Sequence, residues 1–255
     1  MVSGPLSSEL YAELEATLYS GDIDSSLRLL QRVCGEFPDH VGAWELRGLL
    51  EAQRGRPRSA ILYLNRAGEI GALETWSTRT LAMQYRAIDK TDVATDLLHS
   101  LGLHGDLGTG LMRRVLHDLI ELRRPELAAQ LAWHELQLDA KNAVIWHELA
   151  AAQSVIGLPP EDCLRSVQHA IEIAPEIVEY RVTASTFLIR MDAIREAYDV
   201  VCQVVSPSKL QLDCPCCLWR LICLFETFGD HDRMSLCYRK LRTLLGGGKR
   251  SAAAT

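Results

Sequence analysis

The fold is decided by the stretch AWELRGLLEAQRGRPRSAILYLNRAGEI, residues 43–70. A large aromatic residue, Trp44, is followed four positions later by a small one, Gly48, and a second glycine, Gly55, stands where a turn is needed. Small and apolar residues then continue at helical spacing as Ala60, Leu64 and Ala67. Spacings of three and four place side chains on one face of a helix. The stretch therefore predicts two helices joined by a tight turn at Gly55.

The same turn recurs along the chain. Successive turns in this register are 34 to 37 residues apart and fall at Gly21, Gly55, Asp89, Arg123, Gly157, Asp192 and Gly229. After each turn, the position where the second helix crosses the first holds Ser26, Ala60, Ala94, Ala128, Cys163, Ala197 or Met234. Two helices approach to about 8 Å only where the contacting residue is small. Six of these seven residues are small, so the pattern predicts closely packed helix pairs.

Apolar residues continue the buried face of each second helix. One turn further on stand Leu30, Leu64, Leu98, Ala132, Val167, Val201 and Tyr238, and after them Val33, Ala67, Leu101, Glu135, Ala170, Val204 and Leu241. Glu135 breaks the pattern, and we expect the fourth repeat to be re-registered locally. Pro38 and Pro175 stand where a repeat closes, since proline cannot continue the preceding helix.

This pattern resembles the tetratricopeptide repeat (TPR), a helix–turn–helix unit of about 34 residues. The resemblance covers residues 7–245 and implies an all-α fold, a right-handed α-solenoid of antiparallel helix pairs. The seven expected repeats are 7–40, 41–74, 75–108, 109–142, 143–177, 178–214 and 215–245, with a short lead at 1–6 and a flexible tail at 246–255. A non-repetitive α-helical bundle is the alternative.

Composition narrows the classes of function. A net charge of −6 gives no overall basic footprint, which argues against nucleic-acid binding. The N-terminus has neither the basic nor the apolar region of a secretory signal, and Arg220 interrupts the longest apolar run, so we expect no membrane segment. The cysteines do not suggest a disulfide framework. We therefore expect a cytoplasmic, reducing location.

The resemblance also implies which side chains line the concave groove, namely the second, fifth, ninth and twelfth residues of each first helix. The candidate partner-binding residues are Trp76, Arg79, Met83, Arg86, Arg113, Arg114, His117, His147 and Arg190. Arginine presents a planar fork suited to carboxylates, so an acidic segment or a C-terminal carboxylate is the expected ligand. The alternative is a solvated face whose arginines pair with nearby acids. The two-carboxylate clamp of chaperone-binding TPR domains fits no frame of this chain.

The stretch LDCPCCLWRLICLF, which includes Cys214, Cys216, Cys217 and Cys223, predicts a helix that begins at Pro215. Cys214 and Cys217 also form a C-x-x-C pair, which is typical of metal or redox sites. A zinc ion needs four ligands, and Cys202, Cys237 or His231 would have to complete the set. We assign no metal ligand and no cofactor from the sequence.

No catalytic motif is complete. The WHEL segments at 133–136 and 146–149 lack the second histidine of a zinc protease, and the tail GGGKR lacks the first glycine of a phosphate loop. The leading hypothesis is a non-enzymatic scaffold or adaptor that binds a peptide or a partner domain. The competing hypotheses are a redox- or zinc-responsive adaptor, which would use the cysteine-rich last repeat, and a homo-oligomeric assembly factor.

Overall fold

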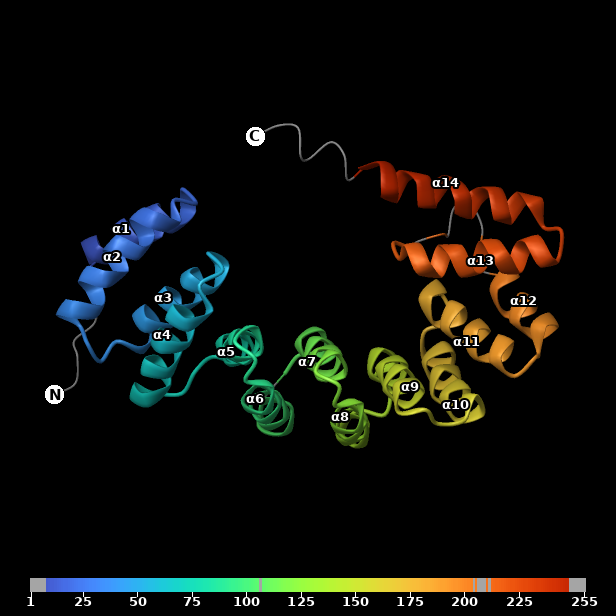
Figure 1. Cartoon of the computed structure of the whole chain (residues 1–255), viewed down its shortest axis with the longest axis horizontal. Coiled ribbons are helices and arrows are strands. Elements are labelled where there is room, and N and C mark those ends of the chain that lie inside the picture. The colour runs from blue at the N-terminus through green and yellow to red at the C-terminus, as the bar shows by residue number, and fades with distance from the viewer. Residues whose placement is uncertain (1–7, 106, 204, 206–209, 211, 248–255) are drawn as a thin grey trace. The chain divides into compact units, whose positions relative to one another are not determined.

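A computed structural model describes residues 8–247 except 106, 204, 206–209 and 211, and within them it contains fourteen α-helices and no strand (Figure 1). The helices are α1 (Ser8–Tyr19), α2 (Ile23–Glu36), α3 (Val41–Gln53), α4 (Pro57–Ile70), α5 (Thr75–Ala87), α6 (Thr91–His104), α7 (Thr109–Glu121), α8 (Pro125–Leu138), α9 (Ala143–Ile156), α10 (Pro160–Ile173), α11 (Val178–Arg190), α12 (Ile194–Cys202), α13 (Pro215–Thr227) and α14 (His231–Gly247). The predicted lead at 1–6 and residues 248–255 of the predicted tail lie outside the described residues, whereas α14 continues to Gly247.

The helices form two compact units, Met1–Arg124 with α1–α7 and Pro125–Thr255 with α8–α14. In the first unit each helix packs against the next one, and α3 also packs against α5. In the second unit α11 likewise packs against α13 as well as against α12. Contact between the first helices of neighbouring hairpins is what stacking of repeats requires. The fold is therefore an all-α solenoid, as the sequence predicts.

The seven predicted turns are confirmed by the backbone. All seven of the predicted turn residues have a positive φ, between 60° and 89°. At Gly55, the N–H of Arg56 donates to the carbonyl of Glu51 and the N–H of Gly55 donates to that of Ala52, both at 3.0 Å. This pair of bonds is the Schellman motif, which ends a helix through one left-handed residue. Glycine takes that conformation without steric cost, but Arg123 does not.

Close packing of the helix pairs explains the small residues. The six predicted small side chains from Ser26 to Ala197 are almost fully buried. Gly48 on α3 shows how tight the approach is, because a Cβ atom there would lie 2.6 Å from Cγ of Leu64 on α4. Met234 on α14 is only partly buried. The spacing in the sequence therefore identified the contacts that hold the hairpins together.

The expected change of register in the fourth repeat is not seen. On α8, Ala128 and Ala132 are buried as in the other repeats, and Leu136 is buried at the position that Cys34 and Gly102 occupy in theirs, so only Glu135 departs from the pattern by staying partly exposed. Burying Leu136 keeps the carboxylate of Glu135 in contact with water, which avoids the cost of burying a charge. None of the described helices combines the length and hydropathy that crossing a membrane would require.

Candidate functional site

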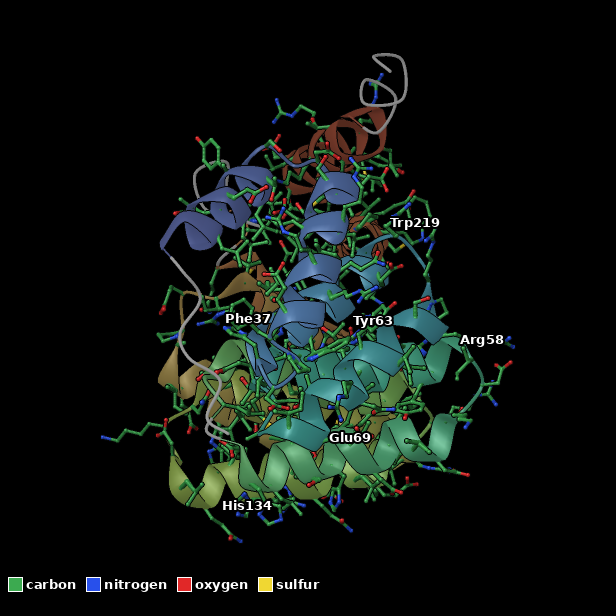
Figure 2. The ribbon with its side chains drawn as sticks, turned by 90° about the vertical axis from the view of Figure 1, so that its left-hand side faces the viewer. Phe37, Arg58, Tyr63, Glu69, His134 and Trp219 are labelled. Carbon is green, nitrogen blue, oxygen red and sulfur yellow. The ribbon has the colours of Figure 1, made fainter. Side chains whose placement is uncertain are left out.

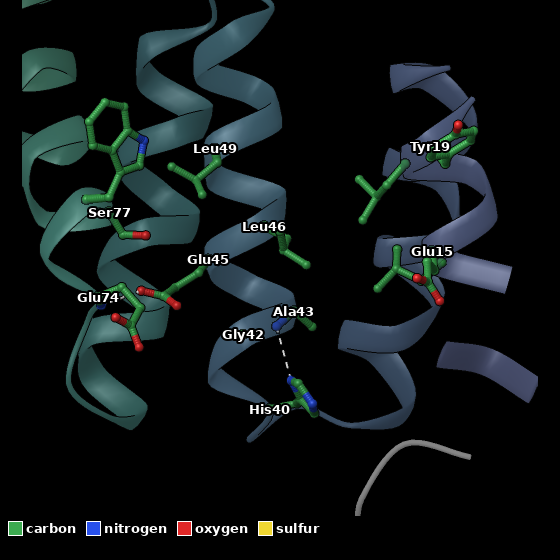
Figure 3. Close-up of a pocket in the computed structure, with 13 residues that line it drawn as sticks. Glu15, Tyr19, His40, Gly42, Ala43, Glu45, Leu46, Leu49, Glu74 and Ser77 are labelled. Atoms are coloured by element: carbon green, nitrogen blue, oxygen red, sulfur yellow. Dashed lines mark hydrogen bonds between the residues drawn. The ribbon is translucent and has the colours of Figure 1, made fainter. Parts of the chain in front are cut away.

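A pocket of about 710 Å³ opens between the first helices of three successive hairpins in the first unit (Figure 3). Its walls come from α1, α3 and α5 with the residues that cap α3 and α5. The lining consists of Leu14, Glu15, Leu18, Tyr19, His40, Gly42, Ala43, Glu45, Leu46, Leu49, Glu74, Trp76 and Ser77. Leucines dominate two of the walls, and three glutamates supply carboxylates while no arginine or lysine lines the pocket. The pocket therefore offers an apolar surface with an acidic border.

Polar contacts fix the positions of the helices around this pocket. Nδ1 of His40 accepts a hydrogen bond from the N–H of Ala43 at 3.1 Å and caps the start of α3 (Figure 3). Oε1 of the buried Glu45 accepts a bond from the N–H of Glu74 at 2.8 Å, where α5 begins. A carboxylate is favoured at a helix N-terminus, where backbone N–H groups lack partners. Glu45 thus links α5 to α3, and one of its carboxylate oxygens is occupied by this hydrogen bond within the protein.

Trp76 belongs to the pocket and to a neighbouring group of arginines on α5 and α7. Its side chain lines the pocket and is 48% exposed. The guanidinium carbons of Arg79 and Arg114 lie 5.4 and 5.7 Å from the centre of its ring. Such cation–π contacts contribute about 0.5–1 kcal/mol each at exposed sites. They hold the indole at the junction of an apolar and a basic surface.

Arg79 is engaged within the protein. Its Nε and Nη2 donate to Oδ2 and Oδ1 of Asp118 on α7 at 2.6 and 3.0 Å. The side chains of Arg79 and Asp118 are only 17% and 7% exposed. A bidentate pair of this kind fixes geometry strongly because both donors of the planar fork are used. Arg79 therefore positions α5 against α7 and supports the indole of Trp76.

Arg86 and His117 share one carboxylate. Nη1 of Arg86 donates to Glu121 Oε2 at 2.5 Å, and Nδ1 of His117 lies 3.4 Å from Glu121 Oε1. The hydrogen bond and charge of Arg86 hold the pKa of Glu121 below its usual value. Met83, which lies between the two arginines on α5, is partly buried. This part of the surface fits the alternative of a solvated face with paired charges.

Arg113 and Arg114 are the exposed arginines of α7. Among the described residues, no carboxylate forms an ion pair with Arg114. Helices α5 and α7 together carry four arginines against Asp118 and Glu121, which leaves two net positive charges when His117 is neutral. Arg114 is thus an exposed arginine of α7 without a described carboxylate partner.

Two predicted residues lie in the second unit, and the structure corrects the expectation for one of them. His147 on α9 is only 8% exposed, because its Nε2 lies 2.9 Å from Oγ1 of Thr183 and its ring packs on Tyr180. It joins α9 to α11 rather than facing a partner. Arg190 is exposed, and its Nη1 donates to Oγ of Ser154 at 2.9 Å.

Sequence reasoning missed most of the pocket. The position rule that selected Trp76 also selects Glu15 and Leu18 in the first repeat, and Glu45 and Leu49 in the second. The signal is therefore present in the first two repeats, whereas the predicted site residues all come from the third to the sixth repeat. Leu46 could not be found by that rule, since it lies between the positions that the rule selects.

A second group of functional side chains lies at the start of α13. Sγ of Cys214 is 2.8 Å from Sγ of Cys216, and these two atoms and Sγ of Cys217 lie within 4.8 Å of one another. Burial is the largest single influence on the pKa of Cys214 and raises it, but hydrogen bonds from the thiols and backbone N–H groups of Cys216 and Cys217 together outweigh burial and leave that pKa below its usual value. Burial raises the pKa of Cys217. The predicted helix start at Pro215 is confirmed, with Cys214 as the N-cap residue but without a side-chain cap hydrogen bond.

Comparison with solved structures places this architecture among known folds. A tetratricopeptide repeat protein from Parabacteroides merdae is 14% identical, with 92% of each chain covered and a TM-score of 0.63. The C-terminal part of a TPR repeat-containing protein from Cytophaga hutchinsonii is 7% identical, with 92% of this chain and 95% of that chain covered and a TM-score of 0.61. PilF of Pseudomonas aeruginosa is 18% identical, with 81% and 92% covered and a TM-score of 0.54. No protein-family model and no curated protein matches the sequence.

Proposed function

We propose that this chain, which has the fold of tetratricopeptide repeat proteins, is a non-catalytic scaffold that binds a peptide segment of a partner protein. The segment carries a bulky apolar residue for the pocket between α1, α3 and α5, and an acidic residue for Arg114 of α7. The observation that carries the proposal is that Trp76 belongs to both surfaces: its side chain lines the pocket, and its ring contacts Arg114.

The pocket supports an apolar anchor. Leucines from α1 and α3 and the indole of Trp76 surround about 710 Å³ of open space. A volume of this size lies within the range of ligand pockets, which are mostly apolar with a few placed polar groups. Tryptophan is enriched among the residues that dominate binding energy at interfaces. A leucine or aromatic side chain of the partner would lose its hydration there.

Arg114 supports an acidic residue next to that anchor. Arg114 is exposed and forms no ion pair with a described carboxylate, whereas Arg79 and Arg86 are paired with Asp118 and Glu121. Exposed arginines attract carboxylates over about 10 Å at 0.1 M salt, which raises the association rate and selects the partner. A partner with acids on the pocket side would instead meet Glu15 and Glu74. The two halves of the surface thus set the direction in which the peptide lies.

Nothing in the site assembles a nucleophile, a base and an oxyanion donor, so binding is the activity proposed. We place the protein in the cytoplasm, because its cysteines do not pair as a disulfide framework. A second copy of the chain and a folded partner domain are the competing ligands.

Selection from a random peptide display library on the immobilised full-length chain tests the proposal. We expect enriched peptides that combine a bulky apolar residue with neighbouring Asp or Glu residues. Binding of a labelled peptide to Arg114→Glu should then be weaker by about 10-fold or more, in line with the cost of placing like charges together.

Arg58→Glu is the matched control, because Arg58 is an exposed arginine of α4 in the same unit and makes the same change of net charge (Figure 2). Binding to this control variant should equal binding to the wild type. Enrichment of no common pattern, or equal losses for Arg114→Glu and Arg58→Glu, would overturn the proposal. Sedimentation of the free chain as a dimer, lost in Trp76→Ala, would identify a second copy as the ligand instead.

A further inference from the structure

Three cysteines meet at the start of α13 because of how a helix begins. Cys214 is the N-cap residue and Pro215 the first helical residue, so Cys216 and Cys217 occupy the second and third positions. The side chain of an N-cap residue folds back toward those two positions, where it usually accepts a backbone hydrogen bond. The sequence C-P-C-C therefore brings three thiols to one point without a second chain segment.

The distances suit a small ion. The three sulfur atoms lie within 4.8 Å of one another, with Cys214 and Cys216 at 2.8 Å. Three thiolates that share one ion at bond lengths of about 2.3 Å lie about 4 Å apart. Cys216 is exposed, so its side chain can rotate away from Cys214 by the remaining ångström without disturbing the core. Closing around an ion thus needs a side-chain movement only.

Packing accounts for Cys217, which contacts the core, but not for Cys214 and Cys216. Cys34, Cys163 and Cys237 are buried within hydrophobic clusters and act as small apolar side chains. Cys216, in contrast, is exposed, and Cys214 is partly exposed. Within the described part of the chain no other cysteine, histidine or carboxylate joins the three sulfurs as a fourth ligand. Cys237 is part of the core behind α13 and α14.

We propose that Cys214, Cys216 and Cys217 form a binding site for one thiophilic d¹⁰ metal ion, Zn²⁺ in the first instance. Each thiol gives its proton to solvent as its sulfur binds the ion. Three protein ligands leave the fourth tetrahedral position open to water or to a donor group of a partner. Soft thiolate ligands favour zinc and cuprous ions over magnesium and calcium. The site lies in the second unit, so it adds a metal-dependent surface to a scaffold whose peptide pocket lies in the first.

Cobalt titration of the reduced full-length chain tests this site, because Co²⁺ reports thiolate ligands through a charge-transfer band in the near ultraviolet. We expect the band to saturate at one Co²⁺ per chain and to disappear when Zn²⁺ is added. Cys216→Ser should weaken binding by about 100-fold or more, since loss of even an outer hydrogen-bonding partner typically costs 10- to 100-fold. Cys214→Ser should do the same.

Cys223→Ser is the matched control, because Cys223 is an exposed cysteine of the same helix outside the cluster. It should leave affinity and stoichiometry unchanged. Cys217 contacts the core, so substituting it could unfold the protein, and the test uses only Cys214 and Cys216. Circular dichroism establishes that the Cys214→Ser, Cys216→Ser and Cys223→Ser variants fold. A band that fails to saturate at one equivalent, or that survives Cys216→Ser at full strength, would overturn the three-thiolate site.

Discussion

The pocket helices α1 and α3 and the arginine helices α5 and α7 belong to the same unit and the same repeat pattern, yet they present opposite chemistry. Among the described residues that line the pocket there are leucines and three glutamates but no arginine or lysine. Helices α5 and α7 carry four arginines. The buried positions of the repeats are nearly constant, whereas the outward positions are free to differ. A repeat scaffold can therefore change its ligand without changing its core.

The comparison also separates two kinds of arginine. Arg79 is largely covered, is paired with the buried Asp118 and holds two helices together, while Arg114 is exposed and has only the ring of Trp76 as a described contact. Residues with the same side chain thus have different roles, one structural and one available to a partner. The largest effects should come from the structural pair.

Asp118→Ala should lower the free energy of unfolding by about 2–3 kcal/mol, because it leaves the largely covered guanidinium of Arg79 without its partner. Arg114→Ala should change the same quantity by less than about 0.5 kcal/mol, as exposed substitutions usually do. Urea unfolding followed by circular dichroism measures both. Replacing Arg79 and Asp118 together by leucines should recover much of the loss. Equal effects of Asp118→Ala and Arg114→Ala would remove the distinction between the two arginines.

Trp76→Ala should weaken binding of a selected peptide by about 30-fold, which corresponds to the roughly 2 kcal/mol typical of a residue that dominates an interface. The loss should be large because this residue belongs to both regions. Trp133→Ala is the control, since Trp133 on α8 is 46% exposed, close to the 48% of Trp76. Fluorescence anisotropy with one labelled peptide compares the variants. A similar loss for Trp133→Ala would show that exposed tryptophans bind the peptide nonspecifically.

Leu49→Ala and Arg114→Ala should each weaken binding by about 5-fold at low salt, or about 1 kcal/mol. The two regions then differ in how salt acts on them. Raising the salt concentration screens the contribution of Arg114, so the difference between wild type and Arg114→Ala should shrink. The loss in Leu49→Ala should persist, because burial of apolar surface is not screened. Parallel salt dependence in both variants would contradict the division into an apolar and a basic region.

Much of this architecture could be predicted from the sequence, because it depends on short-range patterns. Turn residues such as Gly55 and small contact residues such as Gly48 recur at a fixed spacing, so the hairpins follow from periodicity alone. The site was harder to predict, since its contacts join residues far apart in the chain. Asp118 lies 39 positions from Arg79, and His147 is buried by Thr183 and Tyr180 of the next hairpin. Which arginines stay exposed depends on these long-range contacts, which cannot be predicted from the local sequence pattern.

The smallest predicted effect concerns the turn after a pocket helix and the turn after an arginine-bearing helix. The turn after α3 contains Gly55 with φ 69°, whereas the turn after α7 contains Arg123 with φ 60°. A side chain other than glycine costs about 1–2 kcal/mol in this conformation, and the greater freedom of glycine in the unfolded chain offsets part of any gain. Arg123→Gly should therefore raise the free energy of unfolding by about 0.5–1 kcal/mol. Gly55→Arg should lower it by a similar amount, and thermal unfolding measures both. Peptide affinity should stay unchanged in Arg123→Gly, because this residue ends the helix without facing the pocket. A loss of affinity there would mean that the charge of Arg123 belongs to the basic region.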